Sequence, residues 1–487
     1  MTGPPRVLVL ALLVATGCSG GRAPAAPAPS GLPPALQWPG PELTHFTTAH
    51  GLMVARLARD ADESRFALLL ALPAGSLHET AATRGAAAVL ALLLEEGSAW
   101  VPAADGGPLA LAGGEEAGRW LDEHGVTLRS SAWPEQVVLE ARGPAAHARD
   151  ALRVACATAF RPAWNDDDVR LALDRAADLD AERAQGTPGL AEDVLLSRVF
   201  PGHALALPPV PAPDDLPPPD ALRAFHRAAA RSAGALLVIS APDTSWLAAA
   251  VAECRPAADV QAAHLPPAPA PARGDSRAAV VGVTADVGDT VYLRLGGRAP
   301  PPGSAPAAAL GAVLETLANG FSSTLVAELR TRRGLVYGVE AGLLPARLGA
   351  AWYLGTSASA RDAAQVLRSA RRALAAAAAG QVSADAFRRA ARANALAHAA
   401  GVDGVSDLAA AVLDEFRLGL HPGESWRTPA LLWAMDPAEG VAHAGAFLDP
   451  ARTVVVVVAR PGVLEQVLAG ETFEPVAAQD WPPAGMR

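Results

Sequence analysis

The sequence predicts a mixed α/β (α+β) fold of two homologous domains, each a largely antiparallel sheet covered by helices. Three observations support this prediction. The same order of strand-like and helical segments occurs twice along the chain. The strand-like segments that form pairs are joined by short turns, which favours antiparallel pairing. A Pro/Ala-rich segment at residues 264–276 separates the two halves and is typical of a linker.

The predicted strands are short runs rich in Val, Leu and Ile, and the predicted helices are longer Ala-rich segments. In the first half we expect strands at 52–57, 66–72, 126–130, 136–141 and 235–240, and helices at 85–95, 115–124, 145–160, 166–185, 190–199, 219–231 and 246–254. In the second half we expect strands at 278–283, 290–295, 337–344, 350–357 and 453–459, and helices at 305–319, 322–332, 360–379, 384–400, 404–418 and 437–447.

Length and composition agree with two domains. A chain of 487 residues is long enough for two to four domains at roughly 100–200 residues each. Apolar residues make up 51% of the sequence, which excludes general disorder. We expect a signal peptide at 1–18, a tether at 19–39, an N-terminal domain at 40–258, a linker at 259–276, a C-terminal domain at 277–475 and a tail at 476–487.

Charge and cysteine count exclude some classes of protein. The formal net charge is −10, and sequence-independent nucleic-acid binding depends on an excess of basic residues, so we expect no nucleic-acid partner. Three cysteines are too few for a disulfide framework or a four-cysteine zinc site. Cys156 and Cys254 lie in apolar, helix-like segments. The sequence allows them either to form a disulfide or to remain two buried thiols.

The N-terminus has the layout of a secretory signal peptide. Arg6 precedes an apolar run at 7–15 that is too short to span a membrane. The residues before Cys18 resemble a bacterial lipobox, so we expect lipidation of Cys18; an ordinary cleaved signal with a free cysteine is the alternative. Pro, Ala and Gly then dominate to residue 36, as in a stiff tether. These features predict a lipid-anchored protein of the bacterial cell envelope, at the outer membrane facing the periplasm.

Several local motifs point to one family. Residues 319–342 read NGFSSTLVAELRTRRGLVYGVEAG, residues 200–203 read FPGH, and Gly85 and Gly97-Ser98 keep a fixed separation. Together with the two-domain repeat, these stretches resemble the pitrilysin/insulinase zinc peptidases, which include the mitochondrial processing peptidases. The resemblance covers nearly all of residues 40–475. It implies two related α/β domains and a zinc-peptidase ancestry.

The resemblance also implies that the catalytic motif is lost. Active members carry H-x-x-E-H on a helix of the first domain, where two His bind zinc and the Glu is the general base. The glycines that frame this motif are kept here, but its catalytic positions read Ala88, Ala91 and Leu92. Alanine and leucine neither bind zinc nor transfer a proton. We therefore expect no catalytic residue, no metal and no cofactor in this chain.

No other catalytic motif replaces the lost one. The family's third zinc ligand is an acidic residue on a later helix, and Asp180 or its neighbour falls at that place, given an apparent insertion around 100–114. One carboxylate does not make a zinc site, and we interpret this acidic stretch as a solvated helix face. The sequence contains no G-x-S-x-G elbow, Walker loop or dinucleotide fingerprint.

By contrast, the substrate-binding motif of the family is kept. The resemblance assigns to Arg330 and Tyr337 the roles of a substrate-side pair that hydrogen-bonds the peptide backbone. A guanidinium and a phenol are both donors, suited to carbonyl oxygens and to a developing oxyanion. From spacing alone, the alternative is that Arg330 caps its helix and pairs with Glu328 or Glu340 while Tyr337 packs in the core.

Three functional hypotheses follow. The first is a non-catalytic subunit of a heteromeric zinc peptidase, whose partner is a homologous subunit with an intact H-x-x-E-H and the zinc. Its substrate would be a peptide or unfolded polypeptide in the cell envelope. The second is an envelope peptide-binding or scaffold pseudopeptidase that has no protease partner. The third is an active zinc peptidase with unrecognised ligands.

Overall fold

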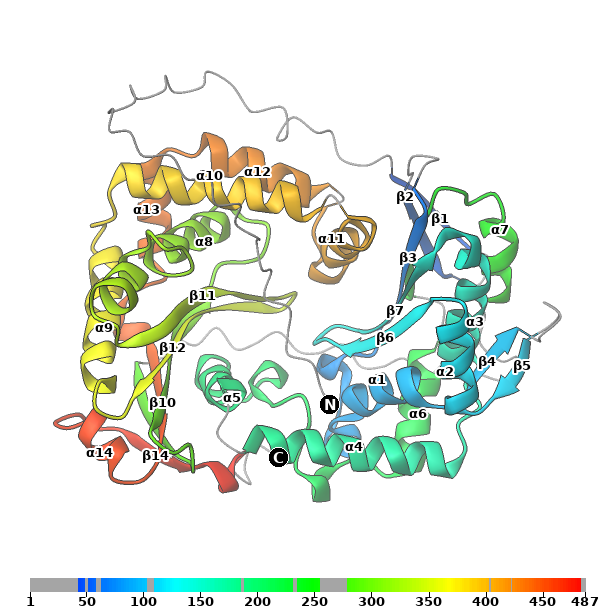
Figure 1. The fold of residues 1–487 in the computed structure, drawn as a ribbon, viewed down its shortest axis with the longest axis horizontal. Coiled ribbons are helices and arrows are strands. Elements are labelled where there is room, and N and C mark those ends of the chain that lie inside the picture. Colours follow the sequence, from blue (N-terminus) through cyan, green and yellow to red (C-terminus); the bar gives the residue numbers. More distant parts are fainter. Residues whose placement is uncertain are drawn as a thin grey trace, which may run out of the picture.

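The computed structural model describes residues 43–48, 51–57, 63–102, 109–184, 188–230, 234–254, 278–402, 404–421 and 423–482. The predicted signal peptide with Cys18, the tether and the linker at 259–276 lie outside the described residues. Figure 1 shows two halves side by side, the first coloured blue to green and the second green to red, each with its own sheet.

Each half contains a six-stranded sheet, and the two sheets share the order of five strands. The first is ordered β1-β2-β8-β3-β7-β6 and the second, read in the same sense, β14-β9-β13-β10-β12-β11. The first sheet comprises β1 (Leu43–Thr47), β2 (Met53–Leu57), β3 (Arg65–Leu72), β6 (Thr127–Ala132), β7 (Val137–Pro144) and β8 (Leu236–Ser240). The second comprises β9 (Ala279–Thr284), β10 (Thr290–Ala299), β11 (Val336–Ala346), β12 (Gly349–Ser359), β13 (Val454–Ala459) and β14 (Glu474–Ala477).

Five strands of each half are therefore equivalent in order and direction. The first and last strands of the repeat pair in parallel, as β2 with β8 and β9 with β13, and the other pairings within the repeat are antiparallel. The outermost strand differs between the halves. In the first sheet β1 precedes the repeat and runs antiparallel to β2, whereas in the second β14 follows the repeat and runs parallel to β9. The predicted duplicated, largely antiparallel fold is confirmed.

The helices follow the strands in the predicted order. The first half has α1 (Ala86–Glu96), α2 (Gly114–Glu123), α3 (Ala148–Phe160), α4 (Asp166–Ala184), α5 (Pro188–Val199), α6 (Pro219–Ala229) and α7 (Leu247–Ala250). The second half has α8 (Ala305–Leu317), the π-helix η8 (Val326–Arg332), α9 (Ala363–Ala378), α10 (Ala384–Gly401), α11 (Val405–Leu418), α12 (Glu424–Ala434), α13 (Pro437–Gly445) and α14 (Val463–Val467).

A few elements were not predicted. Two of them, β4 (Ala99–Pro102) and β5 (Leu109–Ala112), form a small hairpin where the sequence suggested an insertion. The others are α12, α14 and the edge strands β1 and β14. Beyond residue 475 the chain still packs on the second sheet, since Trp481 is 5% exposed.

Each sheet has a main core on one face. In the first half α1 packs against β6 and β7, α3 packs against β3 and β7, and α6 packs on α1. In the second half α8, α9 and α13 occupy the corresponding face of their sheet. Helix α1 is almost wholly apolar and buries Ala86, Val89, Leu90, Leu93 and Leu94, as expected of a helix inside a core.

The other face of each sheet is covered by a helix from the opposite half. Helix α5 of the first half places Val194 and Leu195 on the second sheet, against β10 and β13. Helix α11 of the second half places Leu408 and Val412 on the first sheet, against β3 and β8. Figure 1 shows α5 beside β10 and β12, and α11 facing β3. The sequence predicted sheets covered by helices but not this exchange, because the amphipathic pattern of a helix does not state which sheet it covers.

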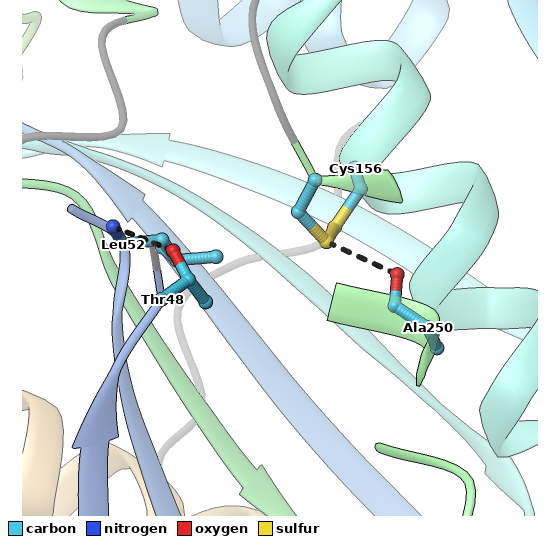
Figure 2. The surroundings of a disulfide bond; sticks show 5 residues. Thr48, Leu52, Cys156 and Ala250 are labelled. Atoms are coloured by element: carbon cyan, nitrogen blue, oxygen red, sulfur yellow. Dashed lines mark hydrogen bonds between the residues drawn. A yellow bond between two sulfur atoms is a disulfide. The ribbon is translucent and has the colours of Figure 1, made fainter. Parts of the chain in front are cut away.

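A disulfide joins Cys156 of α3 to Cys254, which follows the last short helix before the linker. Both side chains are buried, and Figure 2 shows the bond together with the contact between a sulfur atom and the Ala250 carbonyl. The pairing that the sequence left open is therefore formed.

Across the described ranges, no single helix has both the length and the apolar character needed to cross a bilayer. One consecutive pair, α10 and α11, meets that test only when taken together, and it is bent by 112°.

Candidate functional site

The lost zinc motif lies on α1, and one of its three positions borders a pocket. Ala88 lines a cavity of about 450 Å³, whereas Ala91 is 8% exposed within the core and Leu92 packs partly buried against it. The structure therefore brings Ala88 to the cavity and leaves Ala91 and Leu92 away from it.

This cavity, the Ala88 pocket, has walls from both halves. The first half contributes α1, the turn after β6, the end of α4, α5 and the segment that follows α5, and the second half contributes the β11–β12 hairpin. Its lining residues include Ala88, Trp133, Leu196, Phe200, Leu205 and Leu344 among the apolar ones and Arg183, Glu192 and Asp193 among the charged ones. The pocket is thus mainly apolar, with a charged end.

The charged end is a buried cluster of one arginine and two aspartates. Arg183 donates to Asp193 at 3.0 Å and to Asp180, and all three side chains are 11–12% exposed. The interpretation of Asp180 as part of a solvated helix face was wrong, because Asp180 is buried and bound to Arg183. Burial raises the pKa of Asp193 to about 6, against the opposing effect of Arg183.

This raised pKa gives a prediction on stability. Between about pH 4 and 6 the folded protein holds a proton on Asp193 that the unfolded chain releases, so Asp193 stabilises the fold less as the pH rises. We expect the stability of wild type relative to Asp193→Asn to fall by about 2 kcal/mol from pH 4 to 7. Urea unfolding of both proteins across this range measures the change. A difference that does not vary with pH would contradict it.

A second buried ion pair fixes the start of α1. The Glu79 carboxylate accepts hydrogen bonds from the backbone N–H groups of Gly85 and Ala87, both at 2.9 Å, and from Arg84 at 3.2 Å. Burial raises the pKa of Glu79, while these donors lower it. A carboxylate at a helix N-terminus also interacts favourably with the helix dipole. Glu79 therefore holds the helix of the lost motif in place.

A third cluster joins the two halves between two pockets. Arg294 of β10 donates to Glu192 of α5 and to Glu340 of β11, both at 2.7 Å, and its guanidinium lies 4.4 Å from the Tyr353 ring. Glu192 lines the Ala88 pocket. Glu340 lines a second cavity of about 390 Å³, the Tyr337 pocket, which lies between the second sheet and the start of α5.

Arg330 lies beside Tyr337, which lines the Tyr337 pocket. Arg330 is near the end of η8, and its guanidinium lies 5.4 Å from the Tyr337 ring and 5.5 Å from the Phe321 ring. Tyr337 is 88% exposed and Phe321 78%. Within the described ranges no carboxylate forms an ion pair with Arg330; Glu328 binds Arg333 instead. The alternative of a capping arginine and a core tyrosine is therefore wrong.

Arg330 and Tyr337 do not share a pocket with Ala88. Tyr337 belongs to the Tyr337 pocket, and Ala88 belongs to the Ala88 pocket on the other side of the Arg294 cluster. Gly334, with a φ of 63°, makes the turn between η8 and β11 that brings Arg330 next to Tyr337.

The residues that the structure describes contain no group of three or more His, Cys, Asp or Glu side chains that could hold a metal ion. In particular, Asp180 has Arg183, not a histidine, as its neighbour. A zinc-based site cannot be assembled from Ala88, Ala91 and Leu92 on chemical grounds, because none of them carries a ligand atom.

Comparison with known proteins identifies the relationship. Residues 219–394, from α6 to α10, match the sequence model of a family described as "Peptidase M16 inactive domain". This segment of the chain is similar to an M16 inactive domain. The match includes η8 and the start of β11, and hence Arg330 and Tyr337. It supports the resemblance to the pitrilysin-type peptidases, and it does not extend to α1, where Ala88, Ala91 and Leu92 lie.

Solved structures show that the M16-like fold extends beyond the matched segment. A peptidase M16 inactive domain from Pseudomonas fluorescens is 18% identical with a TM-score of 0.73, covering 86% of this chain and 98% of that one. A protease from Helicobacter pylori is 14% identical with a TM-score of 0.75, covering 86% and 100%. The periplasmic protease PqqL from Escherichia coli is 16% identical with a TM-score of 0.64, covering 86% of this chain and 45% of PqqL. No curated protein sequence matches the M16-like chain.

Several residues of the site were missed by sequence reasoning. Trp133, Arg183 and Asp193 meet at the Ala88 pocket from segments far apart in the sequence, so no local pattern marks them. Phe321 lies inside the recognised motif, and its apolar ring in a polar turn was a signal that could have been used.

Proposed function

We propose that this chain is a non-catalytic subunit of a heteromeric zinc metallopeptidase, in which it binds the substrate beside a zinc-bearing homologue. The observation that carries the proposal is the exposed Arg330–Tyr337 pair on an M16 inactive domain. Among the residues that the structure describes, no carboxylate pairs with the Arg330 guanidinium, and the Tyr337 phenol is 88% exposed, so both can donate hydrogen bonds to another molecule.

The chemistry of the pair suits an extended polypeptide. Successive carbonyl oxygens of a peptide accept hydrogen bonds, and Arg330 and Tyr337 offer donors from adjacent positions. The same donors stabilise the oxyanion that forms when a peptide bond is attacked. The partner would supply H-x-x-E-H and the zinc, which activates water and polarises the scissile carbonyl. This chain cannot bind the zinc itself, because the motif positions hold Ala88, Ala91 and Leu92.

The separation of the two pockets supports a shared site between chains. If Arg330 and Tyr337 served a site within this chain, they would be expected to face Ala88. Tyr337 instead borders a different cavity, so we propose that it and the neighbouring Arg330 face the zinc helix of the partner subunit.

We further propose that the protein works in the bacterial cell envelope, anchored through a lipid on Cys18 at the outer membrane and facing the periplasm. The Cys156–Cys254 disulfide supports this location, because disulfides persist in oxidising compartments such as the periplasm. The domain limits at 40–258 and 277–475 are part of the same proposal.

The test begins with the full-length lipoprotein, purified by affinity from its native membrane. A near-stoichiometric protein with H-x-x-E-H would be the expected partner. In the purified complex, we expect Arg330→Ala and Tyr337→Phe to lower kcat/KM for an unfolded polypeptide about tenfold or more, with the zinc content unchanged.

Arg368→Ala is the matched control, because Arg368 is also an exposed helical arginine of the second half and lies on α9. Full activity of both the Arg330 and the Tyr337 variants would exclude the shared site.

A second function is favoured by the Ala88 pocket. Its mainly apolar lining, in a place without metal ligands, suits the capture of a polypeptide without cleavage. Recovery of the chain alone from the membrane, with retained polypeptide binding, would support this envelope peptide-binding or scaffold protein.

A further inference from the structure

The two sheets end in equivalent edge strands. Strand β6 is the last strand of the first sheet, and β11 holds the same place in the second. An edge strand presents unpaired N–H and C=O groups to which an extended polypeptide can add as a further strand. Both edges, however, have side chains bound to these groups.

The pairing of β6 with β7 determines which backbone N–H and C=O groups of β6 point away from the sheet. Trp133 donates to the Gln136 carbonyl, and hydrogen-bonded pairs then alternate along the hairpin, so Leu128 and Ser130 direct their backbone groups away from β7. The Glu95 carboxylate accepts the Ser130 N–H at 2.8 Å. Arg129 donates to the Leu128 carbonyl at 3.3 Å and to Glu95 at 3.0 Å. An ion pair therefore occupies two neighbouring outward groups of this edge.

On β11 a single asparagine side chain binds the outward backbone groups of the edge strand. The side-chain amide of Asn319 donates to the Ala341 carbonyl at 2.8 Å and accepts the Ala341 N–H at 2.9 Å. The backbone N–H of Asn319 also donates to the Val339 carbonyl at 3.3 Å. Asn319 thus takes the place of a residue in a neighbouring strand. It has a φ of 71°, a left-handed conformation that asparagine tolerates better than most residues.

The two capping side chains come from equivalent positions in the repeat. Glu95 lies in the last turn of α1, and Asn319 lies just beyond the end of α8. These helices occupy the same place in the two halves, between the second and third strands of the repeat. The outward backbone groups of the equivalent edge strands are bound by a carboxylate in one half and by an amide in the other.

We propose that Glu95 with Arg129, and Asn319, close both edges to the addition of a polypeptide strand. A bound polypeptide would then contact the chain through side-chain groups such as Arg330 and Tyr337, and not by main-chain pairing with β6 or β11. The closure of the edges is inferred from the hydrogen bonds of Glu95, Arg129 and Asn319. The statement about how a polypeptide binds rests in addition on the proposed function.

Hydrogen exchange of the full chain at single-residue resolution tests the closure without any ligand. We expect Glu95→Ala to speed exchange of the Ser130 amide about tenfold, and Glu95→Gln, which keeps an acceptor, to restore part of the protection. Glu96→Ala is the matched control, because Glu96 is the exposed neighbour on α1. Asn319→Gly keeps the left-handed backbone but removes the side chain, and should speed exchange of the Ala341 amide. Unchanged exchange at Ser130 and Ala341 in these variants would overturn the closure.

A second arm adds reduced, carboxymethylated α-lactalbumin as an unfolded polypeptide. For wild type we expect no new protection at Leu128, Ser130 or Ala341, and for the Glu95→Ala/Arg129→Ala variant we expect new protection along β6. New protection of the Ser130 or Ala341 amide in wild type would overturn the proposal. If the probe does not bind wild type at all, the peptide-binding function fails, while the exchange in the absence of probe still decides whether the edges are closed.

Discussion

Arg417→Ala is expected to lower the free energy of unfolding by about 3–5 kcal/mol, because it leaves a buried carboxylate without its counter-ion. Arg417 of α11 donates to Glu135 at 3.0 Å, and their side chains are 3% and 9% exposed. Its guanidinium also lies 4.7 Å from the Trp133 ring. Glu135 and Trp133 belong to the turn between β6 and β7, so this cluster fastens a helix of the second half to the first sheet.

Urea unfolding followed by circular dichroism measures this loss. The matched control is Arg388→Ala, which breaks a pair with Asp385 whose side chains are 50% and 82% exposed. We expect that control to change stability by less than about 1 kcal/mol. The double variant Glu135→Leu/Arg417→Met should recover much of the loss, since it removes both buried charges together. An Arg417→Ala protein as stable as the Arg388→Ala protein would contradict the assignment.

The second large effect is expected from the disulfide. Replacing Cys156 and Cys254 with alanine should lower the free energy of unfolding by about 2–5 kcal/mol, because the bond closes a long loop in the unfolded chain. The two cysteines are 98 residues apart, and both side chains are buried. The bond therefore also fixes the C-terminal end of the first half on α3.

Comparison of oxidised and reduced protein isolates this effect. Reductant should lower the urea midpoint of the wild type and leave that of Cys156→Ala/Cys254→Ala unchanged. Mass measurement before and after alkylation checks that the bond is present in the protein from its native envelope. Equal midpoints for oxidised wild type and the variant would show that the bond adds no stability.

Much of the fold could be predicted because the local signals are strong. β-Branched runs such as Val454–Ala459 predict strands, and the Ala-rich segments between them predict helices. The edge strands β1 and β14 were missed for a physical reason. Residues Leu43–Thr47 are mostly exposed and have no alternating pattern, so only pairing with β2 makes them a strand.

The site was predicted in part. The motif around Arg330 and Tyr337 could be predicted because it lies within one continuous segment. The loss of the zinc ligands could be predicted because Ala88 and its neighbours occupy the motif's positions in the sequence. The cluster of Arg183 with Asp180 and Asp193 was not predicted, because two helices must meet before the charges become partners. Glu95 looked like an ordinary helix-end carboxylate until the sheet edge beside it was known.

The exchange of α5 and α11 between the halves has a consequence for how the protein is made. The first sheet is complete once β8 has been synthesised, but its second apolar face stays uncovered until residues 405–418 arrive. The contacts that close this face are therefore far apart in sequence, and such contacts form slowly. Until then the nascent first half exposes Leu57, Leu69 and Val238, which makes it prone to aggregation and a client for chaperones. A half cut at the linker would leave one apolar face of its sheet without the helix that covers it.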